Sequence, residues 1–256
     1  MRIVPVTVVT KIIGRVMTGI TVLAAFSTPV AAQPPGLVVS VAASMNDALA
    51  EIAGLYRAAT GVTVAVNTGS SNTLARQIVE GAPAALFLSA DEIQMDIVEK
   101  AGRTVAGTRT RLLSNELVVI VPADPRPGTG IEQVLGGHVR RIAMGEPGAV
   151  PAGVYGRKYF ERKGAWARVE PKVIPFPTVR GVVAAVEAGR VDAGVVYATD
   201  ARTARVTVID RATDIDIVHS AAVLRGPREE AARRFLEFLK TGPARAVFTK
   251  RGFIPL

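Results

Sequence analysis

Cysteine is absent from the 256-residue chain. This excludes disulfide bonds, a thiolate nucleophile, a cysteine-bound zinc site and a cysteine-linked lipid anchor, although an oxidising compartment stays open to the chain. Aromatic residues make up only 5%, so the core must consist of Ala, Val, Ile and Leu. Pockets for organic solutes are mostly apolar and aromatic, so the composition disfavours a receptor for an organic solute. With 49% hydrophobic and 21% charged residues, the chain is typical of a globular protein.

Signals for catalysis are equally scarce. The two histidines, His138 and His219, lie far in sequence from any candidate nucleophile, and we expect both at the surface. No H-E-x-x-H, G-x-S-x-G or P-loop motif occurs. Asp91, Glu92 and Asp96 could in principle meet a metal ion, but they are more typical of a solvated helix face with acids in its first turn. The sequence therefore favours a protein that is not an enzyme and has no cofactor.

The first 32 residues have the pattern of a secretory signal peptide. Three cations and no acid accompany an apolar run from Val16 to Phe26, and small residues at Val30 and Ala32 precede the predicted cleavage before Gln33. The alternative, a membrane anchor, needs roughly 20 apolar residues, and this run has 11. Removing 32 of 256 residues leaves 224, and losing three cations lowers the formal charge from +9 to +6. We predict an exported, periplasmic protein.

The remaining positive charge is spread along the chain. The densest groups, residues 109–111 and the pair Arg140 and Arg141, are short, and no basic stripe with interleaved aromatics occurs. We therefore predict no nucleic-acid partner. Scattered cations give only a mild long-range attraction for small anions.

Strand and helix patterns alternate along the mature chain, which predicts an α/β fold with parallel sheets covered by helices. Its length favours two lobes over one continuous sheet. We assign residues 33–117 and 222–256 to lobe I and residues 118–221 to lobe II, with the apolar runs near Val119 and at 221–224 crossing between them. The last predicted helix, 227–239, ends before Gly242 and Pro243.

Hydroxyl residues and helix starts gather where predicted strands pass into helices. These positions are Ser44; Ser70, Ser71 and Thr73; residues 151–153; Thr178 with Val179; and Tyr197. Ligands of open α/β sheets bind beyond the carboxyl ends of the strands, where helix N-termini offer free N–H groups to anions. Each residue also has an alternative role: Ser44 could cap a helix together with Asp47, and Tyr197 could bind backbone at a rim.

Several segments resemble the periplasmic molybdate-binding proteins of ABC transporters. The matching stretches, in chain order, are 41–44 (VAAS), 69–78 (GSSNTLARQI), 81–91 (GAPAALFLSAD), 150–153 (VPAG), 179–181 (VRG), 194–197 (GVVY) and 251–253 (RGF). Each is weakly specific alone, and their shared order over the mature chain makes the resemblance specific.

The resemblance implies a two-lobed type II periplasmic binding fold that closes over a dehydrated tetrahedral dianion. It implies that the oxyanion is held by Ser44, Ser71, the backbone amides of Ala152 and Val179, and Tyr197, without direct bonds to the metal atom. It also implies a monomeric receptor for molybdate, and tungstate, that docks transiently on a membrane ABC permease. Two departures from the family pattern are Ala85, where an acid is usual, and Glu146, where aspartate is usual.

Two other functions stay open at this stage. A receptor for sulfate or another small anion would use the same kind of site. An exported serine hydrolase would use Ser44 or Ser71 as its nucleophile, and would need a base within hydrogen-bond reach.

Overall fold

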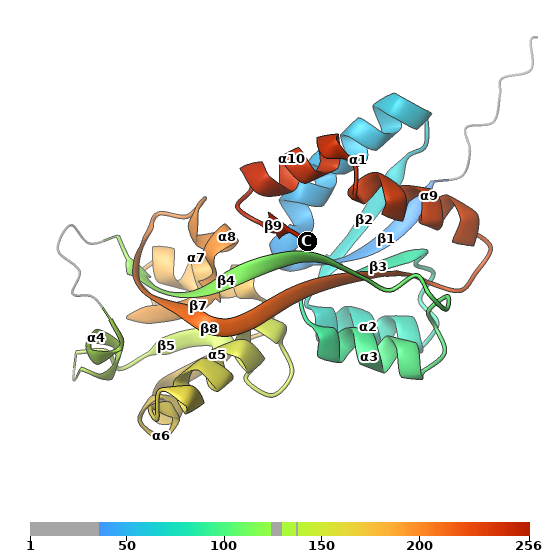
Figure 1. Ribbon diagram of the computed structural model, residues 1–256. Helices are drawn as coiled ribbons and strands as arrows, with labels where there is room; N and C mark the ends of the chain where they lie inside the picture. The colour runs from blue at the N-terminus through green and yellow to red at the C-terminus, as the bar shows by residue number, and fades with distance from the viewer. Residues whose placement is uncertain (1–35, 124–129, 137) are drawn as a thin grey trace, which may run out of the picture. The chain divides into compact units, whose positions relative to one another are not determined.

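The computed structural model describes residues 36–123, 130–136 and 138–256, so the predicted signal peptide lies outside the described residues. Nine strands of the described chain form one sheet in the order β2-β1-β3-β8-β4-β7-β5-β6, with β9 paired to β4 (Figure 1). The strands are β1 Leu37–Ala42, β2 Val64–Gly69, β3 Leu86–Ser89, β4 Thr110–Pro122, β5 Ile142–Gly145, β6 Val173–Phe176, β7 Ala193–Tyr197, β8 Val206–Val223 and β9 Ile254–Pro255.

The two ends of this sheet are parallel and its middle is antiparallel. Strands β1, β2 and β3 pair in parallel and form what we call the first half, and β5, β6 and β7 do the same in the second half. The long strands β4 and β8 pair antiparallel and pass through both halves. The predicted alternation of strands and helices is thus confirmed, but the described strands form one continuous sheet, in which two crossing strands join the two parallel groups.

Helices cover both faces of each half. In Figure 1, α1, α9 and α10 lie on one face of the first half and α2 and α3 on the other, while α7 and α8 lie opposite α5 and α6 in the second half. The helices are α1 Asn46–Thr60, α2 Ser71–Val79, α3 Glu92–Lys100, α4 Ile131–Leu135, α5 Pro151–Arg162, α6 Trp166–Val169, α7 Val179–Glu187, α8 Ala198–Ala201, α9 Glu229–Leu239 and α10 Gly242–Lys250, with 3-10 turns η1 Ala43–Met45 and η2 Glu170–Lys172. Within the described residues, no helix is long and apolar enough to span a membrane.

Helix α1 shows how the sequence produces these elements. Its buried side chains Leu49, Ile52 and Tyr56 recur at helical spacing and face the core. The helix ends at Gly61, whose left-handed backbone (φ 74°) suits glycine. Tyr56 packs edge-on against Phe235 of α9 at 4.9 Å between ring centroids. Burying each such large side chain stabilises the fold by about 1.5–3 kcal/mol.

The apolar runs near Val119 and at 221–223 do lie in crossing strands, and the predicted helix 227–239 corresponds to α9, but two features of this part of the chain differ from the prediction. The crossing strands are far longer than their apolar runs: β4 begins at Thr110 and β8 extends over Val206–Val223. Gly242 and Pro243 do not terminate the helical part either, because they open α10, where proline in the first turn is well tolerated.

The topology places six strand ends around one region. The turn η1 follows β1, α2 follows β2 and α3 follows β3, and all three strands run in the same direction. In the second half, α5, α7 and α8 follow β5, β6 and β7 in the same way. Helix N-termini from both halves therefore meet at the carboxyl ends of the strands.

Candidate functional site

All five residues that the sequence predicts to hold an oxyanion line a single cavity between the two halves of the sheet. The lining residues are Ala42, Ala43, Ser44, Ser70, Ser71, Ala90, Val150, Pro151, Ala152, Thr178, Val179 and Tyr197. The cavity measures about 20 Å³. Such a space fits a group comparable to one or two water molecules, well below the roughly 300–1,000 Å³ of sites for larger organic ligands.

Ser71 offers a free hydroxyl proton at the start of α2. Its buried Oγ accepts the backbone N–H of Ala90 at 2.9 Å, so its own O–H stays available as a donor. The hydroxyl of its neighbour Ser70 is already committed, because it donates to Asn72 Oδ1 at 2.5 Å and lies 3.0 Å from Thr73 Oγ1. Of these two serines, Ser71 is therefore the better ligand donor.

Ser44 has a buried hydroxyl with no partner. It lies in η1, and its Oγ makes no hydrogen bond within the part of the chain that the structure describes. The alternative of a capping pair with Asp47 is not formed, since neither η1 nor α1 has a side-chain cap. Leaving a buried hydroxyl unpaired costs about 1–3 kcal/mol. A ligand that accepts this proton would remove that cost.

Two backbone amides from the second half complete the donor set. Ala152 follows Pro151 in the first turn of α5, and Val179 is the first residue of α7. Neither N–H finds an acceptor among the described residues, as expected for the first turn of a helix. At α7, Thr178 uses its side chain to cap the N–H of Gly181 at 3.2 Å. The Val179 N–H is thereby left for a ligand.

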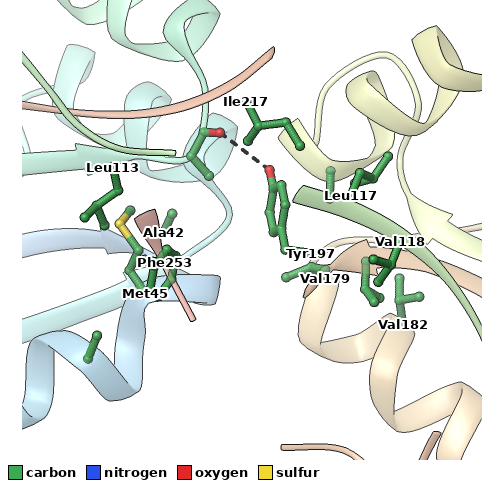
Figure 2. Packing of buried hydrophobic residues seen from close by; sticks show 14 of the residues in the cluster. Ala42, Met45, Leu113, Leu117, Val118, Val179, Val182, Tyr197, Ile217 and Phe253 are labelled. Carbon is green, nitrogen blue, oxygen red and sulfur yellow. Dashed lines mark hydrogen bonds between the residues drawn. The ribbon is translucent and has the colours of Figure 1, made fainter. Parts of the chain in front are cut away.

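Tyr197 reaches across the cavity from the end of β7. Figure 2 shows its ring directed away from Val179 and Val182 toward the first half, where the hydroxyl donates to the Ala90 carbonyl at 3.5 Å. That distance marks a weak hydrogen bond. Burial and nearby acids hold the pKa of Tyr197 well above its ordinary value, so the hydroxyl keeps its proton. A ligand oxygen could accept that proton in place of the Ala90 carbonyl.

Neither an acidic nor a basic side chain occurs among the described residues that line the cavity. The donors are hydroxyls and helix N-termini, whose dipoles present partial positive charge. An anion held here would be stabilised by hydrogen bonds and helix dipoles, without a charged side chain. The described residues also contain no cluster of three or more acids or histidines that could hold a metal ion.

Buried acids lie just behind this shell. Asp91 caps α3 through the N–H of Gln94 at 2.9 Å, and burial raises its pKa to about 6. Burial likewise raises the pKa of Asp200 to about 7. The expected solvated face at 91–96 is therefore wrong for Asp91, which is buried. Glu92 and Asp96 are partly exposed, and they pair with Arg109 at 2.7 and 2.6 Å.

His219 is the second residue whose expected place is wrong. The exposed side chain is His138, whereas His219 in β8 is fully buried. Its ring lies 5.3 Å from that of Tyr197 and 5.6 Å from that of Phe253, and neither ring nitrogen has a partner within the described chain. Burial without a partner lowers the pKa of His219 to about 3.

We expect this histidine to make the fold sensitive to acid. The unfolded chain, with a histidine pKa near 6.5, takes up the proton before the folded chain does. The stability that neutral His219 provides is thus complete above about pH 6.5 and is lost as the pH falls toward 3. His219→Phe keeps an aromatic ring and removes the titrating group. In urea unfolding, the free energy of unfolding of this variant minus that of wild type should therefore increase by a few kcal/mol between pH 7 and pH 4. A difference that stays constant with pH would contradict this assignment.

The comparison of the two proteins also removes the contributions of Asp91 and Asp200 to the pH dependence. Their pKa values are raised, so these contributions have the opposite sign, and they are the same in both proteins.

Neither departure from the family pattern removes a candidate ligand. Glu146 takes part in the turn between β5 and α5, where its Oε1 accepts the N–H of Gly148 at 3.0 Å. Ala85 lines another cavity, together with Arg103 and Arg225.

Comparisons with known proteins show which family the chain belongs to. A family model described as bacterial extracellular solute-binding protein matches residues 37–254. The molybdate-binding protein ModA of Escherichia coli is 35% identical over 228 residues, which cover 85% of this chain and 88% of that protein. The solved periplasmic molybdate-binding protein of Azotobacter vinelandii is 26% identical with a TM-score of 0.77, covering 85% of this chain and 98% of that one. The sulfate-binding protein SubI of Mycobacterium tuberculosis, at 17% identity, a TM-score of 0.78 and coverage of 86% and 87%, shares the fold alone.

Proposed function

The chain belongs to the bacterial extracellular solute-binding proteins, and from this premise we propose that it captures molybdate, and also tungstate, for an ABC permease. Its architecture is the type II periplasmic binding fold that the sequence predicts. As a solute-binding transport protein it is not an enzyme. The ion is its transported ligand and not a cofactor.

One observation carries the proposal: a small cavity without charged side chains collects several uncommitted donors. Ser44 and Ser71 supply hydroxyl protons, and Ala152 and Val179 supply amides. Tyr197 supplies a phenol proton that makes only a long hydrogen bond, 3.5 Å, to the Ala90 carbonyl. A tetrahedral oxyanion offers four acceptor oxygens and has no donor when fully ionised. The two sets are complementary in charge and in hydrogen-bonding role.

The donor set also predicts selectivity. Monoprotonated phosphate carries an O–H that needs an acceptor, and the described lining has no carboxylate to provide one. An unpaired O–H in a dry site costs about 1–3 kcal/mol. Sulfate is fully ionised like molybdate but has shorter bonds, so donors fixed on helix starts cannot all follow it inward. We therefore expect sulfate to bind much more weakly than molybdate, and phosphate hardly at all.

A thermal-shift panel of oxyanions on the exported protein tests the function. Ligand at about 100 times its dissociation constant should stabilise the protein by roughly 2.7 kcal/mol, which raises the melting temperature by several degrees. Molybdate and tungstate should do so at low concentration. No shift with any oxyanion, together with turnover of ester substrates, would contradict the receptor and favour the hydrolase.

The two crossing strands suggest how the protein opens and closes around its ligand. We infer that residues 33–117 with 222–256 form lobe I and residues 118–221 form lobe II, with a hinge in β4 and β8. The β4–β8 register shifts between Asn115 and Leu117, opposite residues 213–216, which is where a bend would fall. Because one chain supplies the whole donor set, a monomer suffices. The closed form would then dock on the permease.

We also infer export with cleavage before Gln33, on the strength of the leader pattern in residues 1–32. The intact mass of the exported protein used in the panel should correspond to a chain starting at Gln33. A mass that includes residues 1–32 would contradict cleavage there.

A further inference from the structure

Arg180 connects the two halves of the sheet next to the cavity. It follows Val179 on α7, and its side chain reaches η1 and α1 of the first half. Its Nε donates to the Ala43 carbonyl at 2.9 Å, and its Nη2 lies 2.9 Å from Asp47 Oδ2. The two acceptors lie on either side of Ser44 in the sequence. A single guanidinium thus joins the turn that carries Ser44 to the helix that carries the Val179 amide.

Apolar packing fixes the Ser44 turn from its own side, with Met45 fully buried in the core, but the turn has few side-chain hydrogen bonds. Both η1 and α1 lack a side-chain cap, and the Ser44 hydroxyl has no partner within the described residues. The Ala43 carbonyl already accepts the N–H of Asn46, and Arg180 uses its remaining lone pair. From the first half, Thr68 donates to the Asn46 side chain at the end of η1 at 2.8 Å. Arg180 adds the side-chain bond that ties this turn to the second half.

We propose that Arg180 is a positioning residue for the oxyanion site. It holds the Ser44 hydroxyl and the Val179 amide at the separation that one ion can bridge. This inference rests on the proposed function. Arg180 is absent from the residues lining the oxyanion cavity and instead lines an adjacent cavity of about 260 Å³ that also contains Ser44 and Asp47. It acts on the ion through Ser44.

The geometry favours arginine at this position. Two nitrogens of one planar group are aimed at two acceptors, which a lysine ammonium with a single nitrogen cannot reproduce. The Arg180 and Asp47 side chains are 43% and 46% exposed. Exposed pairs of this kind contribute little to global stability, so the expected effect falls on ligand binding. Because the contacts join the two halves, breaking them should accelerate dissociation more than it slows association.

The test compares Arg180→Met with wild type by calorimetry and stopped-flow measurement of molybdate dissociation. We expect affinity to fall roughly 10-fold, the size of one lost hydrogen bond to a charged group, with most of the change in the dissociation rate. The melting temperature without ligand should stay near that of wild type. Arg180→Lys should recover only part of the affinity.

Arg157→Met is the matched control. It removes an ion pair of similar exposure, Arg157 with Glu161 at 2.7 Å within α5, and a contact of the same guanidinium with the Trp166 ring of α6. Both contacts lie within the second half, and neither joins it to the first. This variant should bind like wild type. Equal losses in Arg157→Met and Arg180→Met would overturn the inference.

Double variants separate positioning from a general effect. Arg180→Met should have little further effect in a Ser44→Ala background, because the group it positions is gone, and its full effect in a Ser71→Ala background. Wild-type affinity in Arg180→Met, or the same loss in both backgrounds, would overturn the inference while the receptor function stands. A wild-type protein that binds no oxyanion would overturn the proposed function itself, and this inference with it.

Discussion

Calorimetry on Ser44→Ala and on Ser71→Ala should show each variant binding molybdate roughly 10- to 150-fold more weakly than wild type. Each substitution removes one hydrogen bond to a charged ligand in a dry site, worth about 1.5–3 kcal/mol. Ser44 is a strong candidate because its buried hydroxyl has no other partner in the described chain. Ser71 is one because its Oγ already accepts the Ala90 N–H and keeps its proton for a ligand.

Ser70→Ala is the control for this pair. Ser70 lines the same cavity, but its hydroxyl is committed to Asn72 and Thr73. Its replacement should therefore cause a clearly smaller loss than that of Ser71. Wild-type affinity in both Ser44→Ala and Ser71→Ala would remove the basis for the site.

The second large effect is expected at Gly153, beside the Ala152 amide. A Cβ at Gly153 would lie 2.1 Å from the Gly145 carbonyl oxygen and 2.6 Å from the Glu146 carbonyl oxygen. Both atoms are backbone, so the start of α5 would have to move. We expect Gly153→Ala to lower the free energy of unfolding by about 3 kcal/mol or more, and to weaken molybdate binding because the Ala152 amide moves with the helix.

Gly54→Ala provides the contrast, since Gly54 lies inside α1 with nothing within 4 Å of the position of its Cβ. Alanine there should leave stability unchanged or raise it by about 0.4–1 kcal/mol. Urea unfolding of both variants checks the pair. Equal stability of Gly153→Ala and wild type would show that the close approach at the start of α5 does not constrain the fold.

Local sequence signals predicted much of the site. Ser44, Ser71 and Val179 lie at junctions that hydrophobic periodicity and helix-start residues mark, and the parallel order of the strands brings those junctions together. Their arrangement around one cavity depended on the resemblance to a family, because spacing along the chain does not tell which junctions face each other.

Contacts between segments that are distant in the chain could not be predicted from the sequence. The ring of His219 is covered by Tyr197 from β7 and by Phe253 near the C-terminus. The mostly apolar run 217–224 indicates a buried strand, but it does not tell which side chains from other segments enclose the histidine. Arg180 meets Ala43 across 137 positions of the chain. Strand β8 was underestimated because polar and exposed residues interrupt its apolar pattern over much of its length.

Competition calorimetry between molybdate and sulfate tests the central claim most directly. The claim is that hydroxyls and helix amides, fixed around a cavity without charged side chains, select the longer-bonded of two fully ionised tetrahedral anions. Protein saturated with sulfate should still bind molybdate tightly, with tungstate comparable and sulfate displacing either ion only in large excess. Sulfate that displaces molybdate at similar concentrations would contradict the account and make the protein a sulfate receptor.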